Sequence, residues 1–241
     1  MTVHPRGRRS AAAVAAVATL FLLPLPADAG PRGPSGRVMH GHAGSQHLVG
    51  SDRKDLIIAG PGRDQLDGQG GPDNLNGGRG NDRLTGGSGD DRVMGGTGND
   101  QADGGPGRDA VVGIAGDDVL FGGDDADHVS GGTGNDTVSG GPGKDEMDGG
   151  DGNDTIDAGD GDDQITGDRG NDLIYPGPGA DEVYAEEGDA NHIVATNDGV
   201  RDDIWCVKGD MIGKVTGLVT YVGGRDPLDA LRGCRVEVVN G

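Results

Sequence analysis

Aspartate recurs at every ninth position between residues 55 and 181, and no other feature of the chain is better suited to chemistry. The fifteen members of the series are Asp55, Asp64, Asp73, Asp82, Asp91, Asp100, Asp109, Asp118, Asp127, Asp136, Asp145, Asp154, Asp163, Asp172 and Asp181. A fixed period over about half of the chain indicates one structural unit that is copied many times. Carboxylates repeated in register are hard oxygen donors, so the chemistry open to them is the binding of cations.

The repeating unit is Gly-Gly-x-Gly-x-Asp-x-apolar-x, seen without departures from Gly77 to Thr85. One apolar residue in nine, flanked by polar residues, is typical of a very short strand with one face inward. The glycines before the aspartate predict a tight turn, because glycine adopts positive φ and allows backbones to approach closely. Two such units would complete one coil of about 18 residues, and the coils would stack.

The apolar slot is filled by an aliphatic residue or methionine in every repeat. Its occupants are Ile57, Leu66, Leu75, Leu84, Val93, Ala102, Val111, Leu120, Val129, Val138, Met147, Ile156, Ile165, Ile174 and Val183. We expect these side chains to form the core. Such a core is thin, so something must also neutralise the like charges that stacking brings together.

The composition agrees with a requirement for cations. Glycine supplies 52 of the 241 residues, aromatic residues only 2%, and the formal net charge is -21. Acidic, glycine-rich chains with few aromatic residues tend to be disordered when alone. A chain of this charge is also a poor partner for nucleic acid, whose phosphates require clustered Lys and Arg.

Calcium is the ion that the donor set favours. Carboxylates and backbone carbonyls in a flexible turn suit a hard ion that takes six to eight oxygen ligands, whereas magnesium keeps its waters and strict octahedral geometry. Zinc prefers His or Cys, and the array holds only His128 and no cysteine. The predicted ligands are Asp64, Asp73, Asp82, Asp91, Asp100, Asp109, Asp118, Asp127, Asp136, Asp145, Asp154, Asp163, Asp172 and Asp181.

Alternate repeats fall on opposite edges of such a stack, and the two edges differ. One edge carries seven aspartates, mostly preceded by asparagine; the other carries eight, preceded by mixed residues. Because asparagine tolerates turn geometry well, we expect tighter calcium binding along the first edge. Gln69, Ile114 and Asp125 replace glycine in three turns. If ions lie between consecutive coils, six on one edge and seven on the other give at most about thirteen.

The motifs Gly95–Asp100, Gly131–Asp136 and Gly149–Asp154 resemble the nonapeptide repeat of the RTX, or haemolysin-type, calcium-binding family. The resemblance implies an all-β fold, a parallel β-roll similar to a right-handed β-helix, with two nonapeptides per coil. It also implies calcium ions between successive coils of one edge, held by aspartates and turn carbonyls. In toxins, proteases and lipases of this type the repeats follow another domain. Only about 20 residues of linker precede them here, so those activities do not carry over and no enzyme is expected.

The remaining segments are assigned by composition. Residues 1–29 read as a Sec-type signal peptide, with a basic start, an apolar run and Ala27-Asp28-Ala29 before the cleavage point, although Arg8-Arg9 leaves twin-arginine export open. We expect a secreted, extracellular protein without an integral membrane segment. Residues 30–49 are predicted to be a flexible linker, 50–185 the repeat array, and 186–241 a small β-rich C-terminal cap.

The predicted cap departs from the period, with Ala190 in the aspartate slot and His192 in the apolar slot. A short helix is expected from Asp226 to Gly233. Cys206 and Cys234 favour a disulfide in an oxidising compartment, with free thiols as the alternative. The tail is similar to the cysteine-paired ends of small secreted bacterial members of the family.

The leading hypothesis is a secreted calcium-binding protein that folds on binding the ion and has a structural, adhesive or calcium-buffering role. The alternatives are a β-helix hydrolase or polysaccharide-acting enzyme, and an ice-binding surface protein. For an enzyme, His192 with Asp189 and Asp198, or the pair Asp202-Asp203, could act as acid and base. Ice binding is disfavoured because the outward slots lack a regular threonine row.

Overall fold

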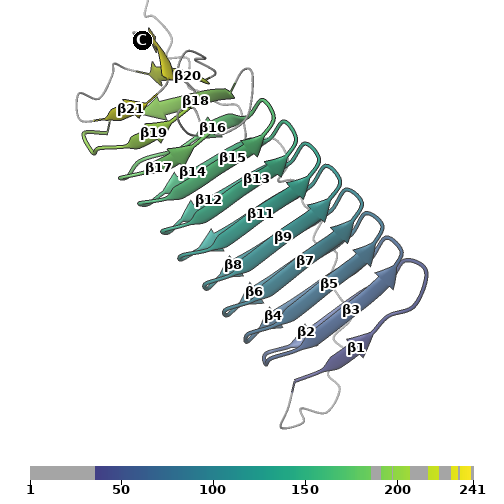
Figure 1. Cartoon of the computed structure of the whole chain (residues 1–241). Helices are drawn as coiled ribbons and strands as arrows, with labels where there is room; N and C mark the ends of the chain where they lie inside the picture. The colour runs from purple at the N-terminus through teal and green to yellow at the C-terminus, as the bar shows by residue number, and fades with distance from the viewer. Residues whose placement is uncertain are drawn as a thin grey trace, which may run out of the picture. The chain divides into compact units, whose positions relative to one another are not determined.

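Short strands and tight turns alternate along the described part of the chain, which contains no helix. The computed structural model describes residues 36–185, 191–196, 198–206, 217–222, 229–232 and 234–239. These residues belong to one compact unit, Ser35–Gly241. Within them, odd-numbered strands form one parallel sheet of eleven and even-numbered strands form a second sheet of eleven (Figure 1).

The odd-numbered sheet contains β1 (Val38–His40), β3 (Leu56–Pro61), β5 (Asn74–Arg79), β7 (Arg92–Thr97), β9 (Ala110–Ala115), β11 (His128–Thr133), β13 (Glu146–Asp151), β15 (Gln164–Arg169), β17 (Glu182–Tyr184), β19 (Asp203–Trp205) and β21 (Ala230–Arg232). The even-numbered sheet contains β2 (His47–Ser51), β4 (Gln65–Gly70), β6 (Arg83–Ser88), β8 (Gln101–Pro106), β10 (Val119–Asp124), β12 (Thr137–Pro142), β14 (Thr155–Asp160), β16 (Leu173–Tyr175), β18 (Asn191–Thr196), β20 (Gly217–Val222) and β22 (Cys234–Val239).

Through the array, each strand pairs with the strand eighteen residues further on. Leu75 aligns with Val93 in one sheet, and Leu84 aligns with Ala102 in the other. Parallel neighbours need a crossover connection, and here the crossover is a strand of the opposite sheet. The structure is therefore a parallel β-solenoid with two nonapeptides per coil, which confirms the predicted β-roll.

The core is a single column of apolar side chains between the sheets. All fifteen predicted apolar residues are at most 1% exposed. Each full strand of the array also turns a second position inward, and that position is glycine or alanine, as at Gly77, Gly86 and Ala158. One large and one very small side chain per strand make a narrow core that fits the short repeat.

The turns depend on positive φ at two positions in most repeats. In the turn after β5 these are Gly78 (φ 104°) and Gly80 (φ 124°). Four other residues hold such angles without being glycine: Gln69 (76°), Ile114 (92°), Asp125 (78°) and Asp168 (63°). The first three were expected departures from the motif; Asp168 was not singled out from the sequence.

The sheets begin before residue 50, which differs from the flexible linker predicted over residues 30–49. Val38–His40 pair with Leu56–Ile58, and His47 begins the first strand of the other sheet. The reason lies in Met39 and Leu48, which align with the apolar slot and pack against the core.

The C-terminal strands β18 to β22 continue the same two sheets. Ile193 aligns with Ile174, so Asn191 and Ile193 fill the aspartate and apolar slots. The predicted assignment of Ala190 and His192 is wrong because this coil contains one extra residue.

The prediction of a short helix from Asp226 to Gly233 is also wrong for residues 230–232, which form the strand β21. The predicted signal peptide, residues 1–29, lies outside the described residues. In the described part of the chain, no helix is long and apolar enough to cross a membrane.

Candidate metal centre

The fifteen repeat aspartates form two ladders, one along each edge of the solenoid, and all are buried. Turns after odd-numbered strands make the asparagine edge, which carries Asp64, Asp82, Asp100, Asp118, Asp136, Asp154 and Asp172. Turns after even-numbered strands make the second edge, which carries Asp55, Asp73, Asp91, Asp109, Asp127, Asp145, Asp163 and Asp181.

One oxygen of each carboxylate is fixed by the backbone of the preceding coil. The amide of Asp82 donates to Oδ1 of Asp100 at 2.7 Å, and the amide of Asp91 donates to Oδ1 of Asp109 at 2.8 Å. The contact repeats along both edges, to Asp172 on one and Asp181 on the other. Backbone hydrogen bonds therefore fix the register of each ladder.

The other oxygen, Oδ2, is buried and accepts no hydrogen bond from the described residues in fourteen of the aspartates. They are Asp64, Asp73, Asp82, Asp91, Asp100, Asp109, Asp118, Asp127, Asp136, Asp145, Asp154, Asp163, Asp172 and Asp181. These are the fourteen residues that the sequence predicts as ligands. A buried carboxylate oxygen without a donor is costly, so the arrangement suits a cation.

In most repeats Oδ2 points into a small cradle of oxygen atoms beside the first glycine of the repeat; alanine or proline holds that position before Asp64, Asp163 and Asp181. A Cβ added at Gly77 would lie 2.5 Å from Oδ2 of Asp82 and 2.7 Å from the carbonyl oxygen of Gly95, one coil further on. At Gly86 the corresponding distances are 2.5 Å to Asp91 and 2.6 Å to the carbonyl of Gly104. Carboxylate and carbonyl oxygens of neighbouring coils thus converge on one side of each turn.

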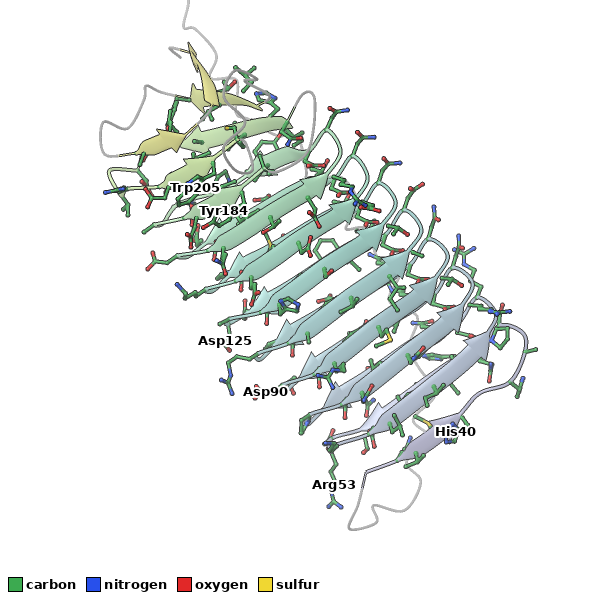
Figure 2. All side chains as sticks on the ribbon, in the orientation of Figure 1. His40, Arg53, Asp90, Asp125, Tyr184 and Trp205 are labelled. Atoms are coloured by element: carbon green, nitrogen blue, oxygen red, sulfur yellow. The ribbon has the colours of Figure 1, made fainter. Side chains whose placement is uncertain are left out.

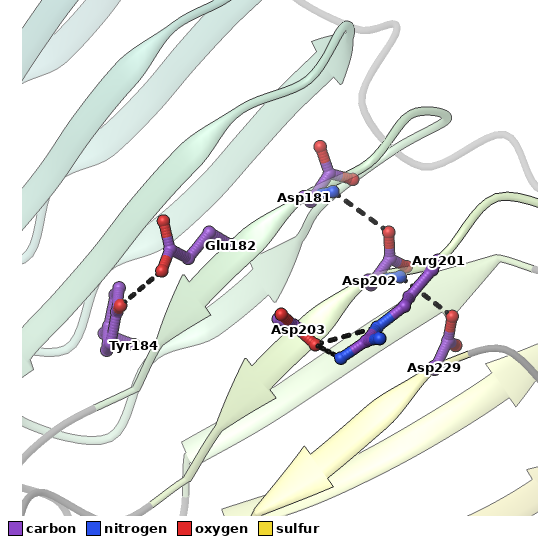
Figure 3. A network of polar contacts seen from close by, with 7 residues as sticks. All are labelled: Asp181, Glu182, Tyr184, Arg201, Asp202, Asp203 and Asp229. Atoms are coloured by element: carbon purple, nitrogen blue, oxygen red, sulfur yellow. Dashed lines mark hydrogen bonds and ion pairs between the residues drawn. The ribbon is translucent and has the colours of Figure 1, made fainter.

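The ladder on the second edge runs on into residues that the sequence period does not reach. The amide of Asp181 donates to Asp202 at 3.1 Å, and the amide of Asp202 donates to Asp229 at 3.0 Å (Figure 3). On the asparagine edge the amide of Asp172 donates to Oδ1 of Asn191 at 2.9 Å. Sequence reasoning missed these residues because the coils lengthen; the only available signal was an Asp or Asn two residues before Ile193, Ile204 and Leu231.

At three ends of the ladders the side-chain atom equivalent to the open Oδ2 has a hydrogen-bond partner. Tyr221 donates its hydroxyl to Oδ2 of Asp229 at 2.7 Å. Asn191 has an amide group in place of Oδ2 and donates it to the carbonyl of Ala185. At the other end, Ser51 donates to Oδ2 of Asp55. The open oxygens are therefore confined to the repeats between these ends.

Burial raises the pKa of the ladder carboxyls. The pKa of Asp118 rises to about 7 through burial, with further repulsion from Asp100 and Asp136. The pKa of Asp181 rises to about 8, again mainly through burial. Such pKa values mean that the ionised ladder is unfavourable until a positive charge offsets it.

A second, exposed ladder distinguishes the asparagine edge. Oδ1 of Asn153 accepts the amide of Asn171 at 2.9 Å, and similar contacts run back to Asn81. On the second edge, comparable contacts occur at Asp90 and Asp162 among the described residues. Turns on the asparagine edge are therefore cross-linked from coil to coil, while those on the second edge are cross-linked only in places.

The donor set fits a hard cation. No group of three or more His, Cys, Asp or Glu side chains that could hold a metal occurs in the described residues. Each level offers one carboxylate per edge, so the remaining ligands would be carbonyl oxygens of the turns. An all-oxygen shell of this kind suits calcium, and it lacks the nitrogen and sulfur ligands that zinc prefers.

A family model for the RTX calcium-binding nonapeptide repeat matches residues 40–75, 67–102, 103–138, 139–174 and 157–189. Together these matches span residues 40–189. The chain belongs to this family, as predicted, and its repeats imply calcium binding. No curated protein matches the chain.

The other candidate residues lie apart from the ladders or have structural contacts. His128 is an exposed outward residue beside Glu146, at 3.6 Å. The ring of His192 contacts Thr220 at 2.8 Å, and Asp198 accepts the amide of Gly179. Asp189 lies outside the described residues.

The position of Cys206 bears on the predicted disulfide. Cys206 is buried directly after Trp205, which aligns with Arg232 of β21. Cys234 begins the next strand two residues later. The backbone thus brings the two cysteines to the same end of the solenoid, and their pairing stays a prediction.

Proposed function

We propose that this protein is a secreted calcium-binding module whose solenoid folds when the ladder aspartates bind the ion. The observation that carries the proposal is the row of fourteen buried Oδ2 atoms without a hydrogen-bond donor. Asp64 to Asp181 at nine-residue spacing, excluding Asp55, would be the ligands, with turn carbonyls completing each shell. Several ions, at most about thirteen, would bind.

Electrostatics link binding to folding. Carboxylates of one ladder repeat with every coil, at about 4.8 Å, and the narrow core contributes little free energy to oppose their repulsion. Calcium supplies two positive charges between neighbouring carboxylates and makes ionisation favourable. Because the sites exist only when coils are stacked, binding free energy becomes folding free energy.

Export fits this dependence on calcium. The predicted signal peptide would carry the chain out of the cell while calcium is too scarce to fold it, and the higher calcium concentration outside would drive folding. The predicted Cys206–Cys234 disulfide would then constrain the last coils, contributing on the order of 3 kcal/mol. A structural, adhesive or calcium-buffering role suits a repeated array whose described residues form no recognisable catalytic constellation.

The proposal is tested by counting bound ions on the mature chain, residues 30–241, by equilibrium dialysis in calcium and in magnesium. We expect several calcium ions per chain and little competition from a similar concentration of magnesium. A matched variant with Asp100, Asp118 and Asp136 changed to Asn should bind fewer ions. A folded chain that binds no calcium at millimolar concentration would contradict the proposal.

A further inference from the structure

The exposed charges of the array are divided unequally between its two halves. In residues 51–110 the exposed cations are Arg53, Lys54, Arg63, Arg79, Arg83, Arg92 and Arg108, and the exposed anions are Asp52, Asp90 and Asp103. In residues 111–185 the exposed anions are Asp117, Asp124, Asp125, Glu146, Asp151, Asp160 and Asp162, and the exposed cations are Lys144 and Arg169. The net exposed charge is seven minus three, or +4, in the first half and two minus seven, or -5, in the second.

This contrast is independent of how many ions the ladders hold. Each coil contributes one buried aspartate per edge, so the ladder and its ions add a similar charge to both halves. The difference between the halves comes mainly from exposed side chains. Half-buried acidic residues add to it in the same direction, since the first half has Asp67 and the second has Asp148, Asp157, Asp168 and Glu182. A molecule with opposite charges at its two halves is complementary to a second copy turned end for end.

The contrast in exposed charge between the two halves is strongest along the second edge. Lys54, Arg92 and Arg108 line a hollow of about 330 Å³ at the corner between this edge and the odd-numbered sheet. The ladder residues Asp73, Asp91 and Asp109 also line it, as does Asp90, which pairs with Arg108 at 3.1 Å. Further along the same edge, Asp124, Asp125, Asp160 and Asp162 are exposed. Arg53, Asp90 and Asp125 lie along this edge at levels about two coils apart (Figure 2).

We propose that two copies of the folded chain associate antiparallel along their second edges. The spacing supports this pairing, because Lys54 and Asp162 lie 54 residues, or three coils, on either side of Arg108. In a pair centred on that coil, Lys54 of each copy faces Asp160 and Asp162 of the other. Arg92 of each copy faces Asp124 and Asp125 in the same way.

The contact is isologous, so every charge pair occurs twice. Its strip covers about seven coils, or roughly 30 Å along the stack, which is short for a stable interface. Exposed charges dominate it, and such contacts are screened by salt. The pair is therefore a weak, reversible dimer that forms at low ionic strength.

The test is sedimentation velocity of the mature chain in calcium, with the circular dichroism spectrum of each sample recorded to establish folding independently of association. We expect dimer at about 0.02 M salt and monomer at about 0.5 M. The double variant Lys54→Glu with Arg92→Glu should be monomeric, as should Asp124→Lys with Asp160→Lys. An equal mixture of the two variants should restore dimer, because the reversed halves then face each other.

Arg63→Glu with Arg79→Glu is the matched control, since it makes the same change of charge near the asparagine edge. This variant should dimerise like the unchanged protein. A folded, monomeric protein at low salt would overturn the proposal. So would equal loss of dimer in the control variant, or failure of the mixture to restore association.

Discussion

At the residue scale, the first glycine of most repeats leaves room for the carboxylate five residues later. Gly86 has no positive φ, so an alanine there would keep its backbone, but its Cβ would meet Oδ2 of Asp91 and the carbonyl of Gly104. We expect Gly86→Ala to remove about one bound calcium and to destabilise the calcium-bound form by about 1–3 kcal/mol. Calcium counting and urea unfolding in saturating calcium measure the two effects.

Ala158 provides the reciprocal variant within the chain, because it occupies the equivalent position before Asp163. Ala158→Gly should open that cradle and raise the affinity of its site. If Gly86→Ala and Ala158→Gly both leave calcium binding unchanged, the cradle beside Oδ2 is not part of the site.

Ile114 stores backbone strain at one turn. It is a β-branched residue with φ 92° and is 40% exposed, in a position that most other repeats fill with glycine. Replacing it by glycine should raise stability by about 1 kcal/mol, since strain of this kind costs on the order of 1–3 kcal/mol. The unfolding midpoint in urea with calcium present measures the gain, and a lower midpoint would show that Ile114 makes a compensating contact.

At the scale of the element, the two edges should differ in calcium affinity. The exposed ladder of asparagines cross-links neighbouring turns on the asparagine edge, which preorganises the carbonyls there. Changing Asp100, Asp118 and Asp136 to Asn should therefore reduce affinity more than changing Asp91, Asp109 and Asp127. Calorimetric titration of the two triple variants compares them, and equal losses would contradict the expected order.

The raised pKa values of the ladder predict opposite effects of pH on the apo and calcium-bound forms. Burial raises the pKa to about 7 in Asp73, Asp109, Asp127 and Asp172, and to about 6 in Asp100, Asp145 and Asp154. The unfolded value is near 4, so between about pH 4 and 7 the folded apo form binds more protons than the unfolded chain. Its stability therefore falls as pH rises through this window.

Without calcium, β structure should thus increase as pH falls from about 7.5 to 4.5. With calcium, which needs ionised carboxylates, the midpoint concentration should rise over the same change of pH. Circular dichroism in chelator and in calcium follows both trends. A β content in chelator that does not vary with pH would contradict the argument.

At the scale of the whole molecule, the sequence period predicted the repeats well and the ends poorly. The nine-residue spacing identified the core column, the coil length and the two ladders, since one slip would move every side chain. It did not find β1 and β2, where Met39 and Leu48 continue the core column without a preceding aspartate. The spacing also missed Asn191, Asp202 and Asp229. Their coils are longer than those of the array, so the ladder continues in space although the spacing in the sequence changes.

The C-terminal coils close the ladders with protein donors, so their removal should affect folding of the whole array. Deleting residues 186–241 would expose Val183 and Ala185 and the edges of β16 and β17. We expect a less cooperative calcium transition at a higher midpoint concentration, with lower solubility. A calcium-folding curve identical to that of the longer chain would show that these coils are dispensable.

The central claim is that calcium binding by the ladder aspartates drives folding of the solenoid. It is tested most directly by far-ultraviolet circular dichroism of residues 30–241 at neutral pH during a calcium titration, with magnesium as control. The account predicts a cooperative change from coil to β structure in calcium and none in magnesium. A complete β spectrum already present in chelator would contradict it, because the fold would then form without the ion.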